Sequence, residues 1–258
     1  TKPFERNAQH TVTHNSLGLR DAEIEDDGRQ RILVLGDSFV WGLDAEAGER
    51  FSELLKPKIP NYKILAAGVS GYGTDQEYLL LRRLWPQVKP AVVVLVFCAD
   101  NDRLDNSSNI RYEGYQKPYF MIGSDGQPVL KGQPVPLSRQ QYFQDVWWVR
   151  NLWLARIAVS IYLKIRHPVL FVPDPTEKLV GMIRAFVEGN GASFFVAIQH
   201  RDDDLARYLQ QNGIPFASLD GAAAYPGDGT GGHWTPQGQA FVAERIFKLL
   251  SENNIVVR

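Results

Sequence analysis

Arg31-Ile-Leu-Val-Leu-Gly-Asp-Ser-Phe-Val-Trp-Gly42 is the stretch that decides the fold. Ile32 to Gly36 is a short run of apolar residues and Gly, and Asp37-Ser38 follows it directly. Such a run, bounded by charge and Gly, indicates a buried parallel strand. Open α/β folds place their sites at the carboxyl ends of these strands, so Ser38 is predicted at the sheet edge, near the start of a helix. A nucleophilic hydroxyl gains there from backbone N–H groups; alternatively, Asp37-Ser38 only caps that helix.

Composition limits the class of protein. The chain has 258 residues, 44% of them apolar, which is enough for one large domain or two small ones with a sizeable core. Lys and Arg number 28 against 29 Asp and Glu, so the formal net charge is −1. No basic run stands out, which argues against nucleic acid as a partner. The single cysteine, Cys98, is expected to be a buried thiol, and it excludes an internal disulfide.

The sequence has no stretch of 18 or more apolar residues, so we expect no membrane span in this chain. The chain starts at Thr1, without a basic and then apolar leader. A start other than Met indicates trimming or processing, and we therefore favour an exported location, periplasmic or extracellular, over the cytoplasm. The most apolar long region, Val146 to Val172, is interrupted by Arg150, Arg156, Lys164, Arg166 and His167.

Strands and helices are predicted to alternate along the chain. This pattern predicts a three-layer α/β/α sandwich with a mainly parallel sheet of five strands, in a single domain over residues 1–258. Residues 1–30 are expected to form an N-terminal arm, and an insertion at about 103–172 is expected to form a cap or rim over the site. The strands are predicted at 31–36, 62–67, 91–98, 193–198 and 214–219, and the helices at 49–56, 74–88, 146–165, 174–188, 202–211 and from 235 onward.

Local signals predict where several helices begin. Thr74 with Glu77 has the spacing of a capping box, and Asp174-Pro-Thr-Glu177 has an N-cap, a Pro at the first position and an acid at the third. Thr235-Pro236 opens the last helix in the same way. In the helix predicted at 146–165, the aromatic residues are expected to pack in a core: Trp147, Trp148, Trp153 and Tyr162.

Four polar or Gly-rich stretches follow predicted strand ends. They are Gly36-Asp-Ser38, Gly68 to Gly73, Ala99-Asp-Asn-Asp102 and the loop that carries His233. Parallel strands bring all four to one edge of the sheet. Together they supply a hydroxyl, backbone N–H groups, an amide and an imidazole, which are the parts needed for acyl transfer.

These residues carry a resemblance to a known family. Gly36-Asp-Ser38, the last Gly of Gly68-Val-Ser-Gly71, Asn101 followed by Asp102, and His233 before the last helix resemble the four blocks of the SGNH (GDSL) hydrolases. The resemblance runs from about Arg31 to the end of the chain in the same order, apart from the insertion. Ser38 is not in a Gly-x-Ser-x-Gly elbow, so the chain does not resemble an α/β-hydrolase.

The resemblance implies a role for each matching residue. Ser38 is the nucleophile, and His233 takes its proton and returns it to the leaving alcohol. The oxyanion hole consists of the backbone N–H groups of Ser38 and Gly71 and the side-chain amide of Asn101. The resemblance implies no cofactor. The remaining histidines have no paired ligand spacing, so we propose no metal: His10, His14 and His167.

The acidic partner of His233 departs from the family pattern. The family usually has Asp three residues before the His, and that position is Thr230 here. Asp228 lies five residues before His233 in a Gly-rich loop, and we favour it as the third catalytic residue. The alternative is a Ser–His dyad in which a backbone carbonyl orients the imidazole. Ala99, where the family often has Gly, leaves the role of Asn101 unchanged.

Each motif also has a structural interpretation. His233 can simply precede a helix cap, Asn101-Asp102 can form a turn, and the Gly residues of 68–73 can serve only the backbone. His200 also lies past a strand end, where a rim or structural role is favoured, and it is left outside the catalytic set.

Three functions fit these observations. We favour a serine esterase that hydrolyses a small acyl ester, such as acetyl, on an alcohol or a carbohydrate, through an acyl-enzyme on Ser38. An O-acyltransferase that acts on a cell-surface polysaccharide uses the same residues, and related domains of the family do so. A non-catalytic binding module is supported only by Thr230. Aromatic residues of the insertion are candidates to line a sugar-binding surface: Tyr112, Tyr115, Tyr119 and Phe120.

Overall fold

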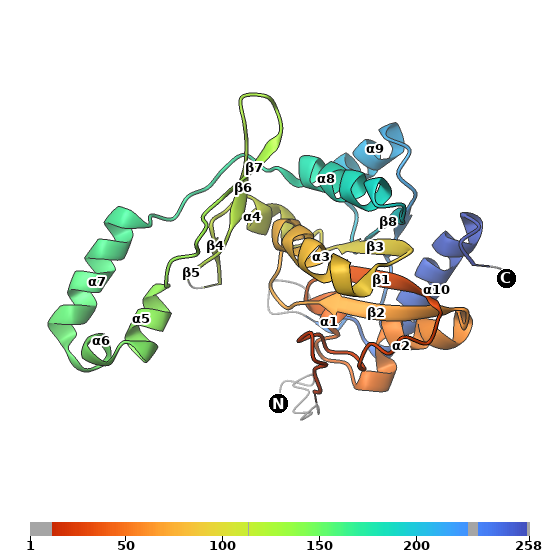
Figure 1. Cartoon of the computed structure of the whole chain (residues 1–258), viewed down its shortest axis with the longest axis horizontal. Helices are drawn as coiled ribbons and strands as arrows, with labels where there is room; N and C mark the ends of the chain where they lie inside the picture. The colour runs from red at the N-terminus through yellow and green to blue at the C-terminus, as the bar shows by residue number, and fades with distance from the viewer. Residues whose placement is uncertain (1–11, 113, 227–231, 257–258) are drawn as a thin grey trace.

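A five-stranded parallel sheet forms the centre of the molecule (Figure 1). The computed structural model describes residues 12–112, 114–226 and 232–256. The strand order is β2-β1-β3-β8-β9, and every neighbouring pair is parallel, as the sequence predicted. The strands span Gln30–Gly36 (β1), Tyr62–Gly68 (β2), Val92–Phe97 (β3), Ser193–Ile198 (β8) and Phe216–Ser218 (β9).

Helices cover both faces of the sheet, which makes three layers. Because side chains alternate along a strand, Leu33 and Leu35 of β1 belong to one core and Ile32 and Val34 to the other. The first core contains α3 (Thr74–Val88), α8 (Thr176–Gly189) and α9 (Asp203–Gln211). The second contains α1 (Ser38–Trp41), α2 (Phe51–Leu55) and α10 (Pro236–Glu252), with short 3₁₀ turns at Ala47–Glu49 and Lys56–Lys58.

The insertion leaves the sheet after β3 and returns at α8. Three short helices, which we call the helical arm (residues 139–166), stand apart from the α/β body in Figure 1. Among the described helices, none is both long and apolar enough to cross a bilayer. The elements of the insertion are α4 (Asp102–Asn106), β4 (Ile110–Arg111), β5 (Tyr115–Gln116), β6 (Tyr119–Ile122), β7 (Pro128–Lys131), α5 (Arg139–Asp145), α6 (Trp147–Asn151) and α7 (Trp153–Arg166).

The helix predicted at 146–165 is two helices, and its aromatic side chains are not core residues. Leu152 has extended backbone angles (φ −118°, ψ 116°), which separate α6 from α7. The expectation of core packing was wrong, because the arm has no other layer on that side. Trp147, Trp148 and Trp153 are 75%, 49% and 77% exposed, and Tyr162 is 47% exposed.

Two helix starts differ from the predicted caps because tertiary contacts take the capping groups. Gly73 is the N-cap of α3, and Thr74 is its first residue. The hydroxyl of Thr74 donates to Asp102 Oδ2 (3.4 Å) instead of closing a capping box with Glu77. At α8 the N-cap is Pro175, and Asp174 accepts from the backbone N–H of Thr176 (3.0 Å). Thr235 caps α10 as predicted.

The described part of the N-terminal arm, residues 12–30, lies over the body and also enters it. Leu19 is fully buried in the first core. Arg20 is 4% exposed and donates to the backbone oxygens of Gly42 (2.6 Å) and Ala45 (2.9 Å). The arm therefore fixes the loop that follows α1.

Candidate active site

Ser38 stands where β1 turns into α1. Asp37 is the N-cap of this helix and accepts a hydrogen bond from the backbone N–H of Phe39 (2.9 Å). The cap is thus supplied by Asp37 alone, and the hydroxyl of Ser38 serves a different contact. A Cβ built on Gly36 would collide with the side chain of Val40, so a Gly is needed where the chain turns closely into the helix.

His233 lies directly against Ser38. Its Nε2 is 2.8 Å from Ser38 Oγ, although the two residues are 195 positions apart in the chain. The loop before α10 holds the imidazole: the backbone N–H of Tyr225 donates to the His233 carbonyl (2.9 Å). A Cβ on Gly232 would collide with the Tyr225 carbonyl, so this approach requires Gly. The predicted meeting of hydroxyl and imidazole at one sheet edge is present in the structure.

The surroundings of the imidazole favour its neutral form. The ring of Phe39 packs on it, with ring centroids 4.8 Å apart, and Trp234 packs on the same phenyl ring. Burial lowers the pKa of His233 below its ordinary 6.5, and the charge of Asp44 opposes this in part. A neutral imidazole can accept a proton from Ser38 at neutral pH.

Asp44 is the carboxylate that the structure places at the other imidazole nitrogen. Its Oδ2 lies 3.4 Å from His233 Nδ1. Asp44 has a left-handed backbone (φ 62°) in the loop after α1, the loop that Arg20 holds. Asp44 was not among the residues predicted from the sequence. Asp228, the acid predicted for this role, lies outside the described residues, as does Thr230.

The Gly-rich turn lies between α1 and α4. A Cβ on Gly68 would collide with the backbone of Trp41, and one on Gly73 would lie 2.9 Å from Asp105 Cβ. Gly71 has a φ of +80°, a conformation that favours Gly. This turn therefore adjoins both the helix that begins at Ser38 and the helix that follows Asn101.

Asn101 occupies the N-cap position of α4, and its side chain is oriented by an acid. Its Nδ2 donates to Asp105 Oδ2 (2.7 Å). An amide nitrogen carries two hydrogens, so this bond fixes the group and leaves one N–H for a ligand. Asp105 also pairs with Arg111 (3.2 Å), which belongs to the insertion.

Two residues of the insertion complete the surroundings of Gly71. Arg111 Nε donates to the Gly71 carbonyl (3.0 Å), and its guanidinium stacks 4.4 Å from the ring centroid of Tyr112. A Cβ on Gly71 would collide with the phenol of Tyr112, so this ring lies over the turn. Of the four aromatic residues proposed for a sugar surface, Tyr112 and Tyr115 are exposed, whereas Tyr119 and Phe120 are buried.

Beneath the site lies a cluster of buried carboxyl groups. Burial is the largest cause that raises their pKa: Asp37 and Asp75 each reach about 6, and those of Glu77 and Asp102 lie well above the ordinary range. Both carboxyl oxygens of Glu77 are buried without a hydrogen-bond partner among the described residues. Lys117 forms an ion pair with Asp75. The raised pKa values of Glu77 and Asp102 limit the negative charge near Ser38 over the range in which free carboxyl groups are ionised.

His200 is not part of the group formed by Ser38, His233 and Asp44. Its Nδ1 lies 3.4 Å from Asp220 Oδ1, and its Nε2 lies 3.9 Å from Asp100 Oδ2. The side chain is 43% exposed, which fits the rim role favoured from the sequence. Within the described ranges, no group of three or more His, Cys, Asp or Glu residues is arranged to hold a metal ion.

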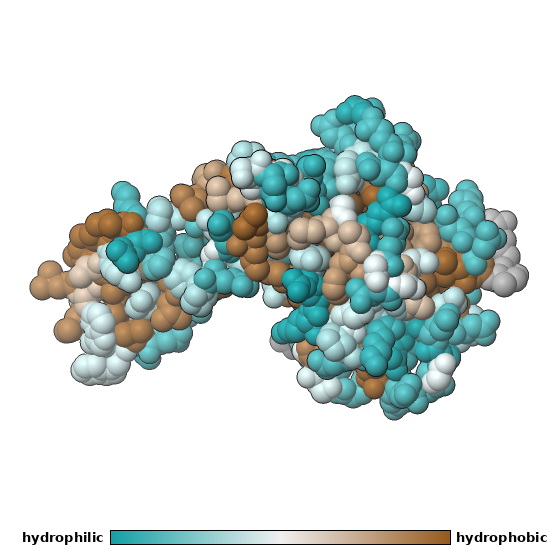
Figure 2. Space-filling view, turned by 45° about the horizontal axis from the view of Figure 1, so that its top comes forward, coloured by the Kyte–Doolittle hydropathy of each residue, from teal (hydrophilic) through white to brown (hydrophobic). Residues whose placement is uncertain are grey.

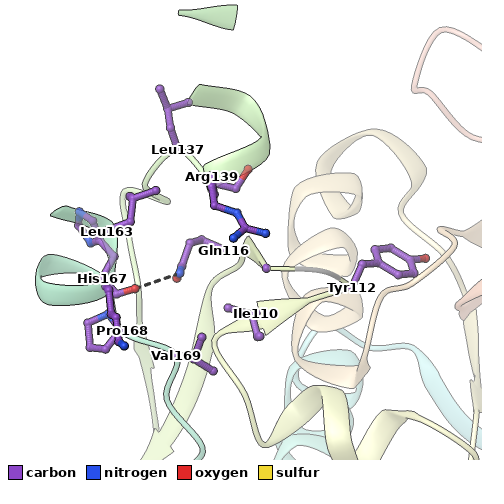
Figure 3. A pocket seen from close by; sticks show the side chains of 12 residues that line it. Ile110, Tyr112, Gln116, Leu137, Arg139, Leu163, His167, Pro168 and Val169 are labelled. Carbon is purple, nitrogen blue, oxygen red and sulfur yellow. Dashed lines mark hydrogen bonds between the residues drawn. The ribbon is translucent and has the colours of Figure 1, made fainter. Parts of the chain in front are cut away.

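A cavity of about 620 Å³ lies between the β4–β5 hairpin and the helical arm (Figure 3). Gln116 donates to the carbonyl of His167 (3.3 Å) across it. The side chain of Tyr112 points away from the other labelled residues in Figure 3, so its backbone borders the cavity while its ring covers Gly71. Neither Ser38 nor His233 lines this cavity.

Comparisons with known proteins give low identities. No family model matches this sequence, and no curated protein matches it. Among solved structures, a lipolytic G-D-S-L family member from Veillonella parvula is 12% identical, with a TM-score of 0.49 over 86% of this chain and 98% of that one.

Two other solved structures have similar values. One described as a putative lipolytic G-D-S-L protein, from Desulfitobacterium hafniense, is 10% identical (TM-score 0.48; 86% and 100% covered). The carbohydrate acetylesterase Est24 from Sinorhizobium meliloti is 13% identical (TM-score 0.47; 87% and 100% covered). What the site of this chain can do follows from its own geometry.

Proposed function

We propose that this protein is a serine esterase that hydrolyses small acyl esters, with an acetyl ester of a carbohydrate as the favoured substrate. The observation that carries the proposal is the distance of 2.8 Å between Ser38 Oγ and His233 Nε2. A hydroxyl hydrogen-bonded to a neutral, partly buried imidazole is the arrangement of an activated nucleophile. Burial of the ring lowers the pKa of His233, which keeps the imidazole in the neutral form that accepts a proton.

In the first half of the reaction, Ser38 Oγ attacks the carbonyl carbon of the ester while His233 Nε2 takes its proton. The tetrahedral intermediate collapses, the bond to the alcohol breaks, and His233 returns the proton to the leaving oxygen. The acyl group then remains on Ser38. In the second half, His233 takes a proton from water, and the water oxygen attacks the acyl carbon. The bond to Ser38 Oγ then breaks, the carboxylic acid leaves, and His233 returns the proton to Ser38 Oγ.

Negative charge develops on the carbonyl oxygen in both halves, and three donors are proposed to receive it. They are the backbone N–H groups of Ser38 and Gly71 and the free N–H of the Asn101 amide. The contact of Asn101 with Asp105 supports this role because it holds the amide in one orientation. The contact of Arg111 with the Gly71 carbonyl holds the Gly-rich turn in the same way.

Asp44 is proposed to orient His233 and to stabilise the imidazolium that forms. Its support is the separation of 3.4 Å from Nδ1 and the anchoring of its loop by Arg20. The role of Asp228 stays a prediction from the sequence. Tyr112, which lies over Gly71, is proposed to restrict the acyl group to a short one, and the exposed rings of Tyr112 and Tyr115 suit the apolar face of a sugar.

The test is hydrolysis of p-nitrophenyl acetate by the Ser38→Ala variant. We expect a loss of at least about 10³-fold in kcat/KM, because no other group supplies the nucleophile. Ser107→Ala, a hydroxyl at the far end of α4, is the matched control and is expected to keep full activity. Circular dichroism verifies that both variants fold. Activity of Ser38→Ala equal to that of the control would refute the esterase.

The same chemistry with a sugar hydroxyl in place of water gives an acyltransferase. Product analysis of the acyl-enzyme in the presence of an added glycan separates the two: acetate indicates hydrolysis, and acetylated glycan indicates transfer. A fluorophosphonate probe that leaves Ser38 unlabelled would favour a binding module.

A further inference from the structure

One face of α7 exposes a continuous apolar stripe. Residues three, four, seven and eight positions apart lie on one side of a helix, and 154, 157, 161 and 165 have this spacing. Leu154, Ile157, Ile161 and Ile165 are 82%, 53%, 55% and 71% exposed. Figure 2 shows hydrophobic side chains gathered over the projecting arm. Exposing four aliphatic side chains to water on one helix is unfavourable in free energy, and a partner that covers them would remove this penalty.

No other part of the chain that the structure describes covers this stripe. α5 and α6 pack on the opposite side of α7, where Val159 is 6% exposed and Val149 of α6 is fully buried. Leu163 and His167, at the end of α7, border the cavity on that inner side. Arg156 joins α6 to α7 by donating to the carbonyls of Val149 (3.2 Å) and Arg150 (2.6 Å). The arm is thus a packed unit with its apolar face turned outward.

The charge of the arm indicates the kind of partner. Residues 139–166 carry five Lys or Arg residues and one acid, Asp145, whereas the whole chain is close to neutral. Lys164 flanks the stripe, is exposed, and takes part in no ion pair with another described residue. A basic surface beside an apolar face suits an anionic amphiphilic layer. Pairing the same face of two copies would bring like charges together.

The aromatic residues of the arm support the same partner. Trp153 and Tyr162 of α7 flank the stripe and are 77% and 47% exposed. Trp and Tyr are enriched where a membrane surface meets water, because one end of the ring system is apolar and the other polar. α7 has 14 residues, which is about 21 Å of helix, too short to span a bilayer core of about 30 Å.

We propose that the exposed face of α7 docks on an anionic membrane surface, with the helix lying in the interface. Leu154, Ile161 and Ile165 enter the boundary of the acyl chains, and the basic side chains reach the headgroup phosphates. The α/β body, with Ser38 in it, is thereby held beside the bilayer. This inference does not depend on the reaction that Ser38 performs.

The experiment is co-sedimentation of the full chain with vesicles of phosphatidylcholine that contain 30% phosphatidylglycerol. We expect the protein to pellet with them, less with pure phosphatidylcholine, and less as salt is raised. The triple variant Leu154→Gln, Ile161→Gln, Ile165→Gln is expected to bind at least about tenfold more weakly. The matched control, Met121→Gln, Ile122→Gln, Val129→Gln on the β6–β7 hairpin, changes exposed apolar residues outside the arm and should bind like wild type.

A second variant keeps the test valid if the triple variant does not fold. Lys164→Glu leaves the apolar stripe intact, reverses the charge that flanks it, and is expected to weaken binding to the anionic vesicles about fivefold or more. Circular dichroism of each variant checks the fold. Equal pelleting of the triple variant and its control, or no pelleting of wild type, would overturn the proposal. The proposal would also be overturned if wild type did not bind vesicles but sedimented as a dimer without lipid, while the triple variant sedimented as a monomer.

Discussion

At the scale of single residues, Asp44 is the side chain with the largest untested consequence. It lies six residues after the nucleophile, and its carboxylate is 3.4 Å from His233 Nδ1. We expect Asp44→Asn to lower kcat on the order of 10²-fold with little change in KM, because the imidazolium loses its counter-charge. Asp228→Asn is the comparison. If only Asp228→Asn loses activity, Asp228 is the acid that orients His233, and Asp44 has no role in the reaction.

The pH dependence of the proposed hydrolysis also tests the contact between Asp44 and His233. Hydrolysis needs neutral His233, so kcat/KM falls as the pH falls through the pKa of this residue. Burial lowers this pKa, and the acid limb of the profile should therefore lie below pH 6.5. Asp44 opposes the shift, so Asp44→Asn should move the limb to still lower pH. A limb that stays in place in this variant would show that Asp44 does not act on the imidazole.

Asn101 is expected to act on the transition state alone. Its amide is proposed to donate to the oxyanion, and removal of one such donor costs about 10²–10³-fold in turnover. Asn101→Ala should therefore lower kcat by about this factor and leave KM close to that of wild type, measured with p-nitrophenyl acetate. A variant that raises KM and preserves kcat would assign Asn101 to substrate binding instead.

The sequence revealed some of these residues and concealed others for a physical reason. Ser38, Gly71, Asn101 and His233 follow the ends of buried strands or precede a helix, and both signals are local. The contact of Asp44 depends on a left-handed turn after a four-residue helix and on Arg20, which comes from the N-terminal arm. No local pattern encodes a contact of that kind.

At the scale of elements, α3 carries a buried acid, Glu77, whose carboxyl oxygens have no hydrogen-bond partner in the described ranges. Glu77 has a pKa well above 4.5, so the folded protein keeps its proton where the unfolded chain has lost it. The stabilising effect of this proton is complete below about pH 4.5 and is lost as the pH rises toward the folded pKa. The free energy of unfolding should therefore decline with pH over that window.

Glu77→Gln tests this expectation, because glutamine is neutral at every pH. In urea unfolding, we expect the variant to be more stable than wild type at pH 8, with a difference that shrinks toward pH 4. Glu25→Gln, at an exposed position in the N-terminal arm, is the control and should show no such trend. A variant less stable than wild type at pH 8 would contradict a protonated Glu77.

Helices and strands were predictable where the apolar run length and the hydrophobic period indicate the same kind of element. The strands are short apolar runs, and β8 was predicted to the residue. The break between α6 and α7 was not predictable, because Leu152 is an ordinary helix former and the bend is set by packing within the arm. The exposure of the aromatic residues was missed because apolar spacing shows which side chains share a face, not whether anything covers that face.

At the scale of the whole molecule, the site joins two portions of the chain that the helical arm separates. β1, β2 and β3 come before the arm, and β8, β9 and α10 come after it. The halves interlock, since Gln239 of α10 accepts from the backbone N–H of Phe51 in α2 (2.9 Å). A cut in the exposed segment after the arm therefore leaves the packed body with both catalytic side chains.

A protease site inserted after Pro173 checks this arrangement. We expect the cleaved protein to keep most of its activity toward p-nitrophenyl acetate, because the sheet and the cores hold the fragments together. Fragments separated in urea should each be inactive, and mixing them after dilution should restore turnover. Loss of activity on cleavage alone would show that the covalent link holds the site together.

The separation of 195 positions between nucleophile and base also has a consequence for synthesis. At translation speeds of roughly 5 to 20 residues per second, Ser38 leaves the ribosome about 10 to 40 seconds before His233. Throughout that interval the growing polypeptide carries an unactivated hydroxyl. A chain that terminates before His233 therefore lacks the proposed base, and its Ser38 hydroxyl stays unactivated.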